Sequence, residues 1–381
     1  MSQPQLHPTA DLLFEPFALG STSLRNRLAM APMTRKRSPD GIPTEEVVNY
    51  YRRRGEGGIG LIFSEGTFID HPSAQAHEGK AYQNIPHFFG AAPLKGWEKV
   101  TAAVQASGAK FMPQLWHVGE VRRLSMPSDP TVPGYGPREI AENGEIVVKA
   151  MDADDIDEIV ASYARGARTA REIGCDGVAL HGAHGYLMDQ FFWPESNSRA
   201  DDFGGAMERR SRLARLVVAA MRDAVGPEFP IVFRFSQWKM TDYNARIAET
   251  PEELAILLRG LAAAGVDLFD VSTRRFWEPA FDGDPRSLAA WTRELSGKPV
   301  MAVGSIGLDQ PHHSKFFRDK AQIDAKVTDL DQLLAAMARG DFDLAAVGRA
   351  ILADPQWAEK VRSGRMTEIR AFVRDDLENY R

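Results

Sequence analysis

The chain has little of what marks disulfide-bonded, cluster-binding or membrane proteins. Its 381 residues include a single cysteine, Cys175. One cysteine excludes an intrachain disulfide, a CxxC metal site and an iron–sulfur cluster held by this chain's cysteines. No run of about 18 apolar residues occurs, so no membrane-spanning helix is expected. Residues 1–9 are polar and lack the apolar core of a secretion signal, so the expected location is cytoplasmic.

An excess of positive charge is also absent. The sequence carries 46 Lys and Arg against 52 Asp and Glu, a formal net charge of −6. This balance favours neither nucleic acid nor an anionic membrane as a partner. No GxGxxG fingerprint opens a helix after the first strand, which argues against a dinucleotide-binding sheet. The composition is that of an ordinary globular protein, with 44% hydrophobic and 26% charged residues, and it provides enough apolar side chains for a large core.

Eight short apolar runs recur along the chain, with helical patterns between them. The runs are apolar on both faces, as the strands of a covered parallel sheet are. They are Leu28–Met33, Ile59–Ser64, Lys110–Leu115, Gly177–Leu180, Pro230–Phe235, Val266–Val271, Pro299–Val303 and Phe342–Val347. The predicted helices include Asp155–Ile173, Met207–Val225, a segment that starts at Pro251 and ends before Gly265, and Leu330–Arg339. This alternation predicts an α/β fold, a single (β/α)8 TIM barrel over residues 1–381. An open doubly wound sheet is the structural alternative.

Two regions depart from this repeat. Residues 118–148 are rich in proline and glycine, and we expect them to form an excursion over the barrel mouth after strand 3, with a hairpin around Asn143-Gly144. Residues 306–326 are polar and contain His312 and His313. We interpret this second region as a solvated surface loop rather than a functional one.

The most informative stretch is Val178–Leu187, where an apolar run ends in a turn with two glycines. This turn contains His181, His184 and Tyr186. Two hydrogen-bond donors and a proton source at one strand end are typical of an active site, because barrel enzymes place their chemistry at the carboxyl ends of the strands. The alternative is a pair of surface-loop histidines and a tyrosine that only packs.

The other strand ends also deliver polar groups. They include Thr34, Gly66, Gln114 with Trp116, Arg234, Gly304-Ser305 and Gly348-Arg349. Glycine turns after strands 7 and 8, the last with an arginine, match the phosphate site common in such barrels. Arg234 lies inside an apolar run, and a buried arginine needs either an anionic ligand or a structural salt bridge.

Several of these segments together resemble the Old Yellow Enzyme family, and they occur in that family's order over about residues 13–357. The motifs are Met30-Ala31-Pro32-Met33-Thr34, Ser64-Glu65-Gly66, Gln114-Leu115-Trp116-His117, His181-Gly182-Ala183-His184-Gly185-Tyr186, Gln190-Phe191-Phe192, Asn197-Ser198-Arg199, Phe203-Gly204-Gly205 and Ala346-Val347-Gly348-Arg349.

The resemblance implies a single barrel domain that binds FMN non-covalently. The cofactor-binding residues that it implies are Pro32, Met33, Thr34, Gly66, Gln114, Arg234, Gly304, Ser305, Gly348 and Arg349. Trp116, Phe276 and Trp277 are expected to bind the substrate, with packing of the last two in their loop as the alternative. No metal is expected.

The implied activity is that of an ene-reductase. Hydride would pass from NAD(P)H through FMN N5 to the β-carbon of an α,β-unsaturated carbonyl compound or another activated alkene. His181 and His184 would bind the carbonyl oxygen, and Tyr186 would protonate the α-carbon. Quinones, nitro compounds or nitrate esters are alternative substrates. The partners expected are these small molecules and NAD(P)H, with the protein a monomer or homodimer.

The sequence leaves three rival functions. A related, longer branch of flavoenzymes adds a cysteine-ligated cluster, and the single cysteine and the end at Arg381 argue against it. A zinc hydrolase barrel could use His181, His184 and Asp189. A flavin-binding protein without catalysis is disfavoured by Tyr186.

Overall fold

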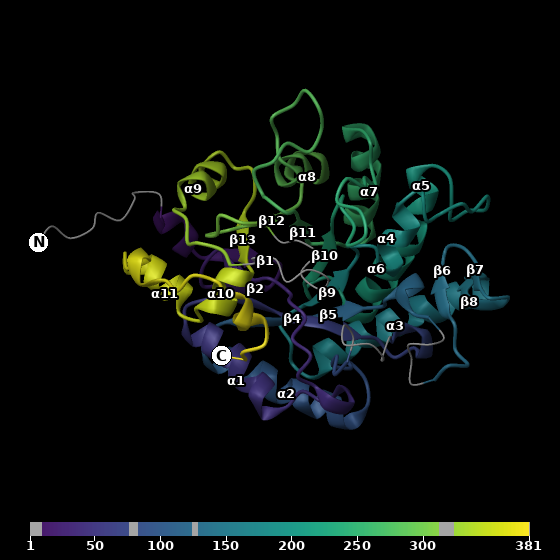
Figure 1. Ribbon diagram of the computed structural model, residues 1–381, viewed down its shortest axis with the longest axis horizontal. Helices are drawn as coiled ribbons and strands as arrows, with labels where there is room; N and C mark the ends of the chain where they lie inside the picture. The colour runs from purple at the N-terminus through teal and green to yellow at the C-terminus, as the bar shows by residue number, and fades with distance from the viewer. Residues whose placement is uncertain (1–9, 76–82, 124–128, 312–323, 381) are drawn as a thin grey trace, which may run out of the picture.

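A computed structural model describes residues 10–75, 83–123, 129–311 and 324–380. Its centre is a closed barrel of eight parallel strands (Figure 1). In chain order they are β3 (Leu28–Met30), β4 (Leu61–Phe68), β5 (Lys110–Trp116), β9 (Val178–His181), β10 (Ile231–Phe235), β11 (Leu268–Ser272), β12 (Val300–Val303) and β13 (Leu344–Val347). Because β13 pairs with β3, the sheet closes, which confirms the barrel and excludes the open-sheet alternative.

Helices surround the barrel. They are α1 (Glu45–Glu56), α2 (Ala91–Ala106), α3 (Ala153–Glu172), α4 (Leu187–Phe192), α5 (Met207–Arg210), α6 (Arg212–Val225), α7 (Pro251–Ala264), α8 (Leu288–Ser296), α9 (Asp331–Ala338), α10 (Arg349–Ala353) and α11 (Trp357–Arg362). Local signals set their ends. Asp152 caps α3 by accepting from the N–H of Asp155, and Thr250 caps α7 before a proline at its first position. The helix predicted over 207–225 is divided at Ser211 into α5 and α6.

The barrel interior is filled by side chains. Alternate residues of the strands point inward and form one apolar cluster, which includes Ala29, Phe63, Met112, Val232 and Leu344. Below them a small hairpin, β1 (Phe17–Leu19) and β2 (Thr22–Leu24), closes the amino end of the barrel. Functional groups can therefore gather only at the opposite, carboxyl end.

A β-bulge in β4 shapes that carboxyl end. Phe63 pairs with Met112 of β5, but the next pair is Gly66 with Gln114, so two residues of β4 face one of β5. The Ser64 hydroxyl accepts the N–H of Gln114 at 2.9 Å within the bulge. The bulge lets β4 run on to Phe68, four residues beyond the predicted end, and it re-aims Gly66 toward Gln114.

The expected excursion after the third barrel strand contains a sheet of β6 (Gly134–Gly136), β7 (Ile140–Glu142) and β8 (Glu145–Ala150). Strands β7 and β8 form the predicted hairpin around Asn143-Gly144. In Figure 1 this sheet lies at the right of the view, beyond the barrel strands. That it covers the mouth stays a prediction. His312 and His313, in the predicted 306–326 loop, lie outside the described residues.

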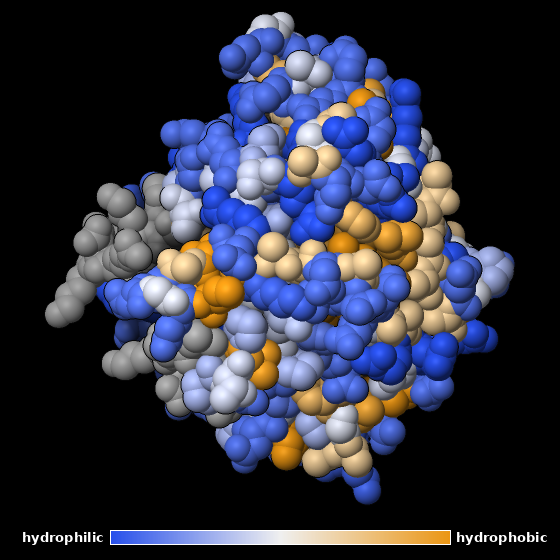
Figure 2. All heavy atoms as spheres, turned by 90° about the vertical axis from the view of Figure 1, so that its right-hand side faces the viewer, coloured by the Kyte–Doolittle hydropathy of each residue, from blue (hydrophilic) through white to orange (hydrophobic). Residues whose placement is uncertain are grey.

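The surface seen in Figure 2 is mainly hydrophilic, with separate hydrophobic areas. Among the described residues the exposed large hydrophobic side chains are Ile146, Leu216 and Val373. None of the helices in the described part of the chain is both long and apolar enough to cross a membrane. Cys175 is buried, and its thiol lies 3.5 Å from the Thr101 hydroxyl.

Candidate active site

Four aromatic rings meet where β5 and β9 end. The Trp116 indole stacks on the His181 imidazole, with ring centroids 5.8 Å apart, and meets the Tyr186 ring edge-on at 4.8 Å. His181 lies 5.0 Å from Tyr186 and 5.2 Å from His184, again centroid to centroid. The structure thus brings together the two histidines, the tyrosine and the tryptophan that the sequence predicted for one site.

His181 is held as a neutral donor. Burial and, to a smaller extent, the nearby Arg234 guanidinium lower the pKa of its imidazole to about 3. Its Nδ1 accepts the N–H of Ala183 at 3.4 Å, which places the ring proton on Nε2. At neutral pH this histidine therefore presents one N–H and no charge.

His184 is oriented by residues to which the sequence analysis gave no role. Its Nε2 lies 2.8 Å from the Ser272 hydroxyl at the end of β11. The Trp238 ring, after β10, packs on the imidazole at 4.3 Å between centroids, and the Ser236 hydroxyl accepts the His184 N–H at 3.2 Å. The only signal for Trp238 in the sequence is its place just after a barrel strand.

Arg234 has a protein partner. It pairs with His181 of β9 on one side and with Asp270 of β11 on the other in the strand register. Its Nε lies 2.8 Å from an oxygen of the Asp270 carboxylate, and both side chains are buried. Burial raises the pKa of Asp270, and Arg234 opposes that rise. The salt bridge named as the alternative explanation of a buried arginine is present, and contact of Arg234 with FMN stays a prediction.

Gln114 offers an unused hydrogen-bond donor at the mouth. Its side chain is buried, and its Nε2 meets no acceptor among the described residues. Gly66 lies beside it, and a Cβ at Gly66 would come within 2.7 Å of the Trp116 ring. A buried amide that lacks a partner costs free energy unless a ligand satisfies it, so this pair fits the polar edge of a flavin ring.

Arg349 offers a second unused donor, after β13. Its Nη2 donates to the Gln310 carbonyl, whereas Nη1 is buried and has no acceptor within the described ranges. Burial lowers the pKa of Arg349 to about 10, so it remains a cation at neutral pH. A guanidinium with a spare N–H beside a glycine turn fits a phosphate group.

The neighbouring turn after β12 has the backbone that glycine requires. Gly304 has φ +149°, and a Cβ there would lie 2.6 Å from the Thr273 hydroxyl. Ser305 has φ 53°, and its hydroxyl donates to the Arg274 carbonyl at 2.9 Å. This turn and Gly348 end adjacent strands, so the predicted phosphate residues lie at one side of the mouth.

The segment after β3 completes that side. Pro32 and Met33 are half-buried and Thr34 is exposed. The Met33 sulfur is 3.7 Å from where a Cβ would lie at Gly348, so the ends of the first and last barrel strands are in contact range. Pro32, Met33 and Thr34 therefore border the same region as Gly348.

Phe276 and Trp277 are not brought to the four rings. Phe276 packs edge-on against Trp277 at 5.0 Å and against Phe342 at 5.9 Å, and both loop residues line a cavity of about 340 Å³ between α8 and α9 residues. These contacts support the packing alternative for the two residues. Their role in substrate binding stays a prediction.

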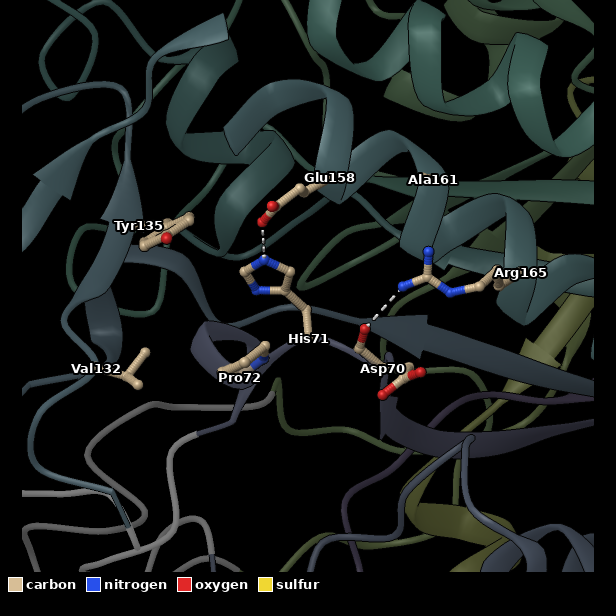
Figure 3. A pocket seen from close by; sticks show the side chains of 8 residues that line it. All are labelled: Asp70, His71, Pro72, Val132, Tyr135, Glu158, Ala161 and Arg165. Atoms are coloured by element: carbon tan, nitrogen blue, oxygen red, sulfur yellow. Dashed lines mark hydrogen bonds and ion pairs between the residues drawn. The ribbon is translucent and has the colours of Figure 1, made fainter. Parts of the chain in front are cut away.

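A larger cavity of about 540 Å³ is lined by none of the predicted site residues (Figure 3). His71 lines it, with Nε2 3.4 Å from the Glu158 carboxylate. The His71 ring is joined through the Ser73 hydroxyl, at 2.8 and 3.0 Å, to His117, the residue after Trp116. This chain of hydrogen bonds braces the end of β5.

The zinc alternative is not supported by this geometry. One oxygen of the Asp189 carboxylate accepts a hydrogen bond from the Lys239 ammonium and the other accepts the Gly185 N–H. Both oxygens therefore have protein partners and do not point to a metal ion beside the histidines. Within the described ranges no group of three or more His, Cys, Asp or Glu side chains could hold a metal ion.

A closed barrel with buried, unused donors and a histidine pair at its mouth fits one class of protein, the flavin-dependent oxidoreductase barrels. The model of the NADH:flavin oxidoreductase / NADH oxidase family matches residues 12–368. The chain therefore belongs to this family, the Old Yellow Enzyme family that its motifs resemble.

Individual relatives agree with this assignment. The chain is 32% identical to an NADH oxidase of Thermoanaerobacter brockii over 95% of its own length, but it spans only 52% of that relative. It is 30% identical to the probable NADH-dependent flavin oxidoreductase YqiG of Bacillus subtilis, covering 98% of this chain and 94% of the relative. Morphinone reductase in complex with tetrahydroNAD superposes with a TM-score of 0.74 at 28% identity, over 92% of this chain and 90% of that one.

Proposed function

We propose that the chain is an FMN-dependent ene-reductase that reduces α,β-unsaturated carbonyl compounds or other activated alkenes with NAD(P)H. The observation that carries the proposal is the packing of His181 against His184 and Tyr186, and of Tyr186 against Trp116, with ring centroids about 5 Å apart. Morphinone reductase, a solved relative, was determined with tetrahydroNAD, which supports a nicotinamide donor.

The two histidines would bind the substrate carbonyl oxygen. His181 donates from Nε2 without carrying a charge. If the Ser272 hydroxyl donates to His184 Nε2, the proton of His184 lies on Nδ1, and His184 would donate this N–H to the same oxygen. Two fixed donors in a buried site stabilise the negative charge that builds on this oxygen during reduction.

Bound FMN would supply hydride, taken from NAD(P)H, to the β-carbon. Gln114 and Gly66 would hold the polar edge of the ring, Gly304, Ser305, Gly348 and Arg349 the phosphate, and Arg234 the edge where negative charge develops. Tyr186 would then deliver a proton to the α-carbon. Quinones, nitro compounds and nitrate esters are the second candidate substrates. Their reduction places no proton on carbon, so it would not require Tyr186 as an acid.

Replacing Tyr186 with Phe tests this function, because it deletes the hydroxyl and keeps the ring that contacts Trp116 and His181. General-acid catalysis is worth about 10² to 10⁴-fold, so reoxidation of reduced enzyme by 2-cyclohexenone should slow by that factor. Flavin reduction by NADPH or NADH should change little. Stopped-flow absorbance of the flavin band measures both steps.

Equal enone reoxidation rates in wild type and Tyr186→Phe would remove Tyr186 from the role of acid. A purified protein without flavin absorbance, even after FMN is added, would refute the proposed function itself.

A further inference from the structure

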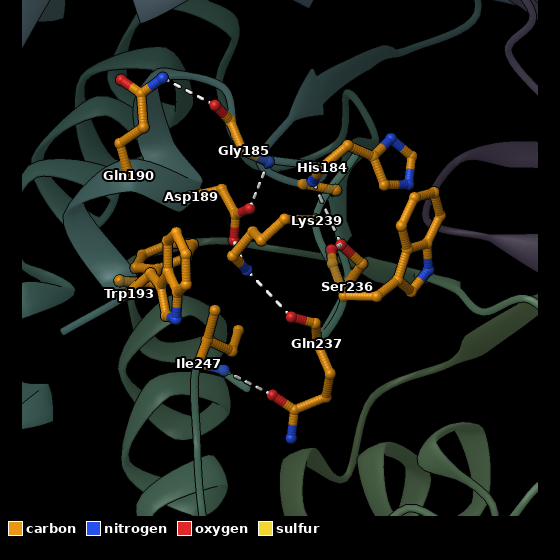
Figure 4. A network of polar contacts seen from close by, with 12 residues as sticks. His184, Gly185, Asp189, Gln190, Trp193, Ser236, Gln237, Lys239 and Ile247 are labelled. Carbon is orange, nitrogen blue, oxygen red and sulfur yellow. Dashed lines mark hydrogen bonds and ion pairs between the residues drawn. The ribbon is translucent and has the colours of Figure 1, made fainter. Parts of the chain in front are cut away.

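A buried ion pair next to the candidate site has no part in the chemistry proposed above. Lys239 Nζ lies 2.9 Å from the Asp189 carboxylate, and both side chains are completely buried. Asp189 comes from α4 and Lys239 from the segment after β10, so the pair joins two elements that flank the end of β9 (Figure 4). The Lys239 ammonium also lies 5.6 Å from the centre of the Trp193 ring.

Both partners of this pair also hold backbone beside His184. The second Asp189 oxygen accepts the Gly185 N–H at 2.5 Å. On the other side, the backbone of Lys239 forms a parallel bridge with His184, and the Met240 N–H donates to the His184 carbonyl at 3.4 Å. Lys239 Nζ additionally donates to the Gln237 carbonyl at 3.0 Å, which fixes the path of its own segment.

The turn that these contacts hold is strained. His184 has φ 66° and Gly185 has φ 85°, so two successive residues adopt the left-handed conformation. For a residue with a side chain this conformation is unfavourable, and it persists only where the surroundings enforce it. Without such contacts, the backbone of His184 would relax and its ring would leave Ser272 and Trp238.

We propose that the Lys239–Asp189 ion pair positions His184 for binding of the substrate oxygen. It clamps the 184–185 turn between α4 and the segment after β10. Lys239 and Asp189 are positioning residues, since they act through His184. The inference rests on the proposed function in so far as His184 is taken to bind substrate.

Energetics favour this role over one in stability alone. Removing two charges from water is costly, and a buried ion pair is often no more stabilising than apolar residues of the same volume. Such a pair is better explained by the single arrangement that it imposes. Here that arrangement is the orientation of one imidazole at the mouth of the barrel.

The test uses the full-length holoprotein and the double variant Lys239→Met with Asp189→Asn. This variant leaves no unpaired buried charge, and the Asn side chain can still accept the Gly185 N–H. The first readout is the affinity for 4-hydroxybenzaldehyde, a phenol expected to bind the histidine pair over oxidised flavin and to give a long-wavelength absorbance band. The second is hydrogen exchange of the His184 and Gly185 amides, followed by mass spectrometry.

We expect phenol affinity to fall by about 10- to 100-fold, because misplacement by about 1 Å has effects of that size. FMN should stay bound, and exchange at the 184–185 amides should accelerate. The matched control is Lys110→Met, which breaks a Lys–Asp pair of the same 2.9 Å length at the amino end of β5. It should leave phenol affinity and exchange at the turn unchanged.

Unchanged phenol affinity, or unchanged exchange at the turn, in the double variant would overturn the inference. If the double variant does not fold, Lys239→Gln, which keeps a donor toward Asp189, is judged by the same two measurements. A wild-type protein that binds no phenol would refute the histidine pair as the substrate site, whereas the exchange measurement would still decide whether the ion pair holds the turn.

Discussion

The surroundings of Glu65 predict how the free energy of unfolding of the protein depends on pH. This carboxyl lies in the β4 bulge and is completely buried. One oxygen accepts the N–H of Arg35 at 2.7 Å and that of Lys36 at 3.1 Å, and the other has no partner among the described residues. Burial raises the pKa of Glu65 from its ordinary value of 4.5 to about 7, and the two N–H groups only partly oppose this rise.

The direction of the pH effect follows from proton binding. Between pH 4.5 and about 7 the folded protein keeps a proton on Glu65 that the unfolded chain has released. The native state therefore binds more protons, and its free energy of unfolding falls as the pH rises through this window. At about 1.4 kcal/mol per pKa unit, the whole effect is about 3.5 kcal/mol.

The perturbation is Glu65→Gln, which keeps the shape and cannot titrate. Relative to wild type, the variant should gain about 2–3 kcal/mol of stability between pH 5 and pH 8. Urea unfolding followed by tryptophan fluorescence, with FMN in excess at both pH values, measures the free energies. Comparing the two proteins cancels the titration of all other groups. The control, Glu98→Gln, changes an exposed residue of α2 and should show no such difference.

A difference between wild type and Glu65→Gln that does not change with pH would refute the reasoning. It would mean that Glu65 releases its proton at the same pH in the folded and unfolded chain, and that the bulge is hydrated or rearranged around the carboxylate.

Two further predictions concern the arginines. Arg349→Ala should weaken FMN retention, because a charge-assisted contact with the phosphate is lost; full flavin absorbance of this variant after dialysis would contradict the assignment. Arg234→Met should slow flavin reduction by NAD(P)H. It should also lower the free energy of unfolding by about 3–5 kcal/mol, since it leaves the buried Asp270 carboxylate without its ion-pair partner. Adding Asp270→Asn should restore stability but not the reduction rate, and a restored rate in stopped-flow traces would show that Arg234 is only structural.

The barrel could be predicted from the sequence because its signals are local. Each strand is a short apolar run, and helices such as α3 and α7 are marked by their own caps. The histidines and Tyr186 could be assigned to one site because they share a single turn after β9. The barrel and the central part of the site could therefore be predicted, because their signals lie between residues that are close in sequence.

The remaining site residues depend on register and packing between distant segments. Arg234 meets Asp270 because β10 and β11 pair with those two residues opposite each other, and no local pattern encodes that alignment. Asp189 was considered as a metal ligand, but its partner Lys239 lies 50 residues away in a segment without regular periodicity. The bulge at Glu65 could not be predicted from the sequence either, since an extra residue in a strand leaves its apolar character unchanged.

The pairing of β13 with β3 has a consequence for biosynthesis. The first and last barrel strands become neighbours only once the residues up to about 347 have been made, and Met33 can then approach Gly348. A nascent chain on the ribosome has an unpaired edge at β3 until that moment, and one wall of the mouth is missing. The site is therefore completed late in translation. Truncations within β13 should leave chains that are captured by chaperones or degraded instead of partially active enzymes.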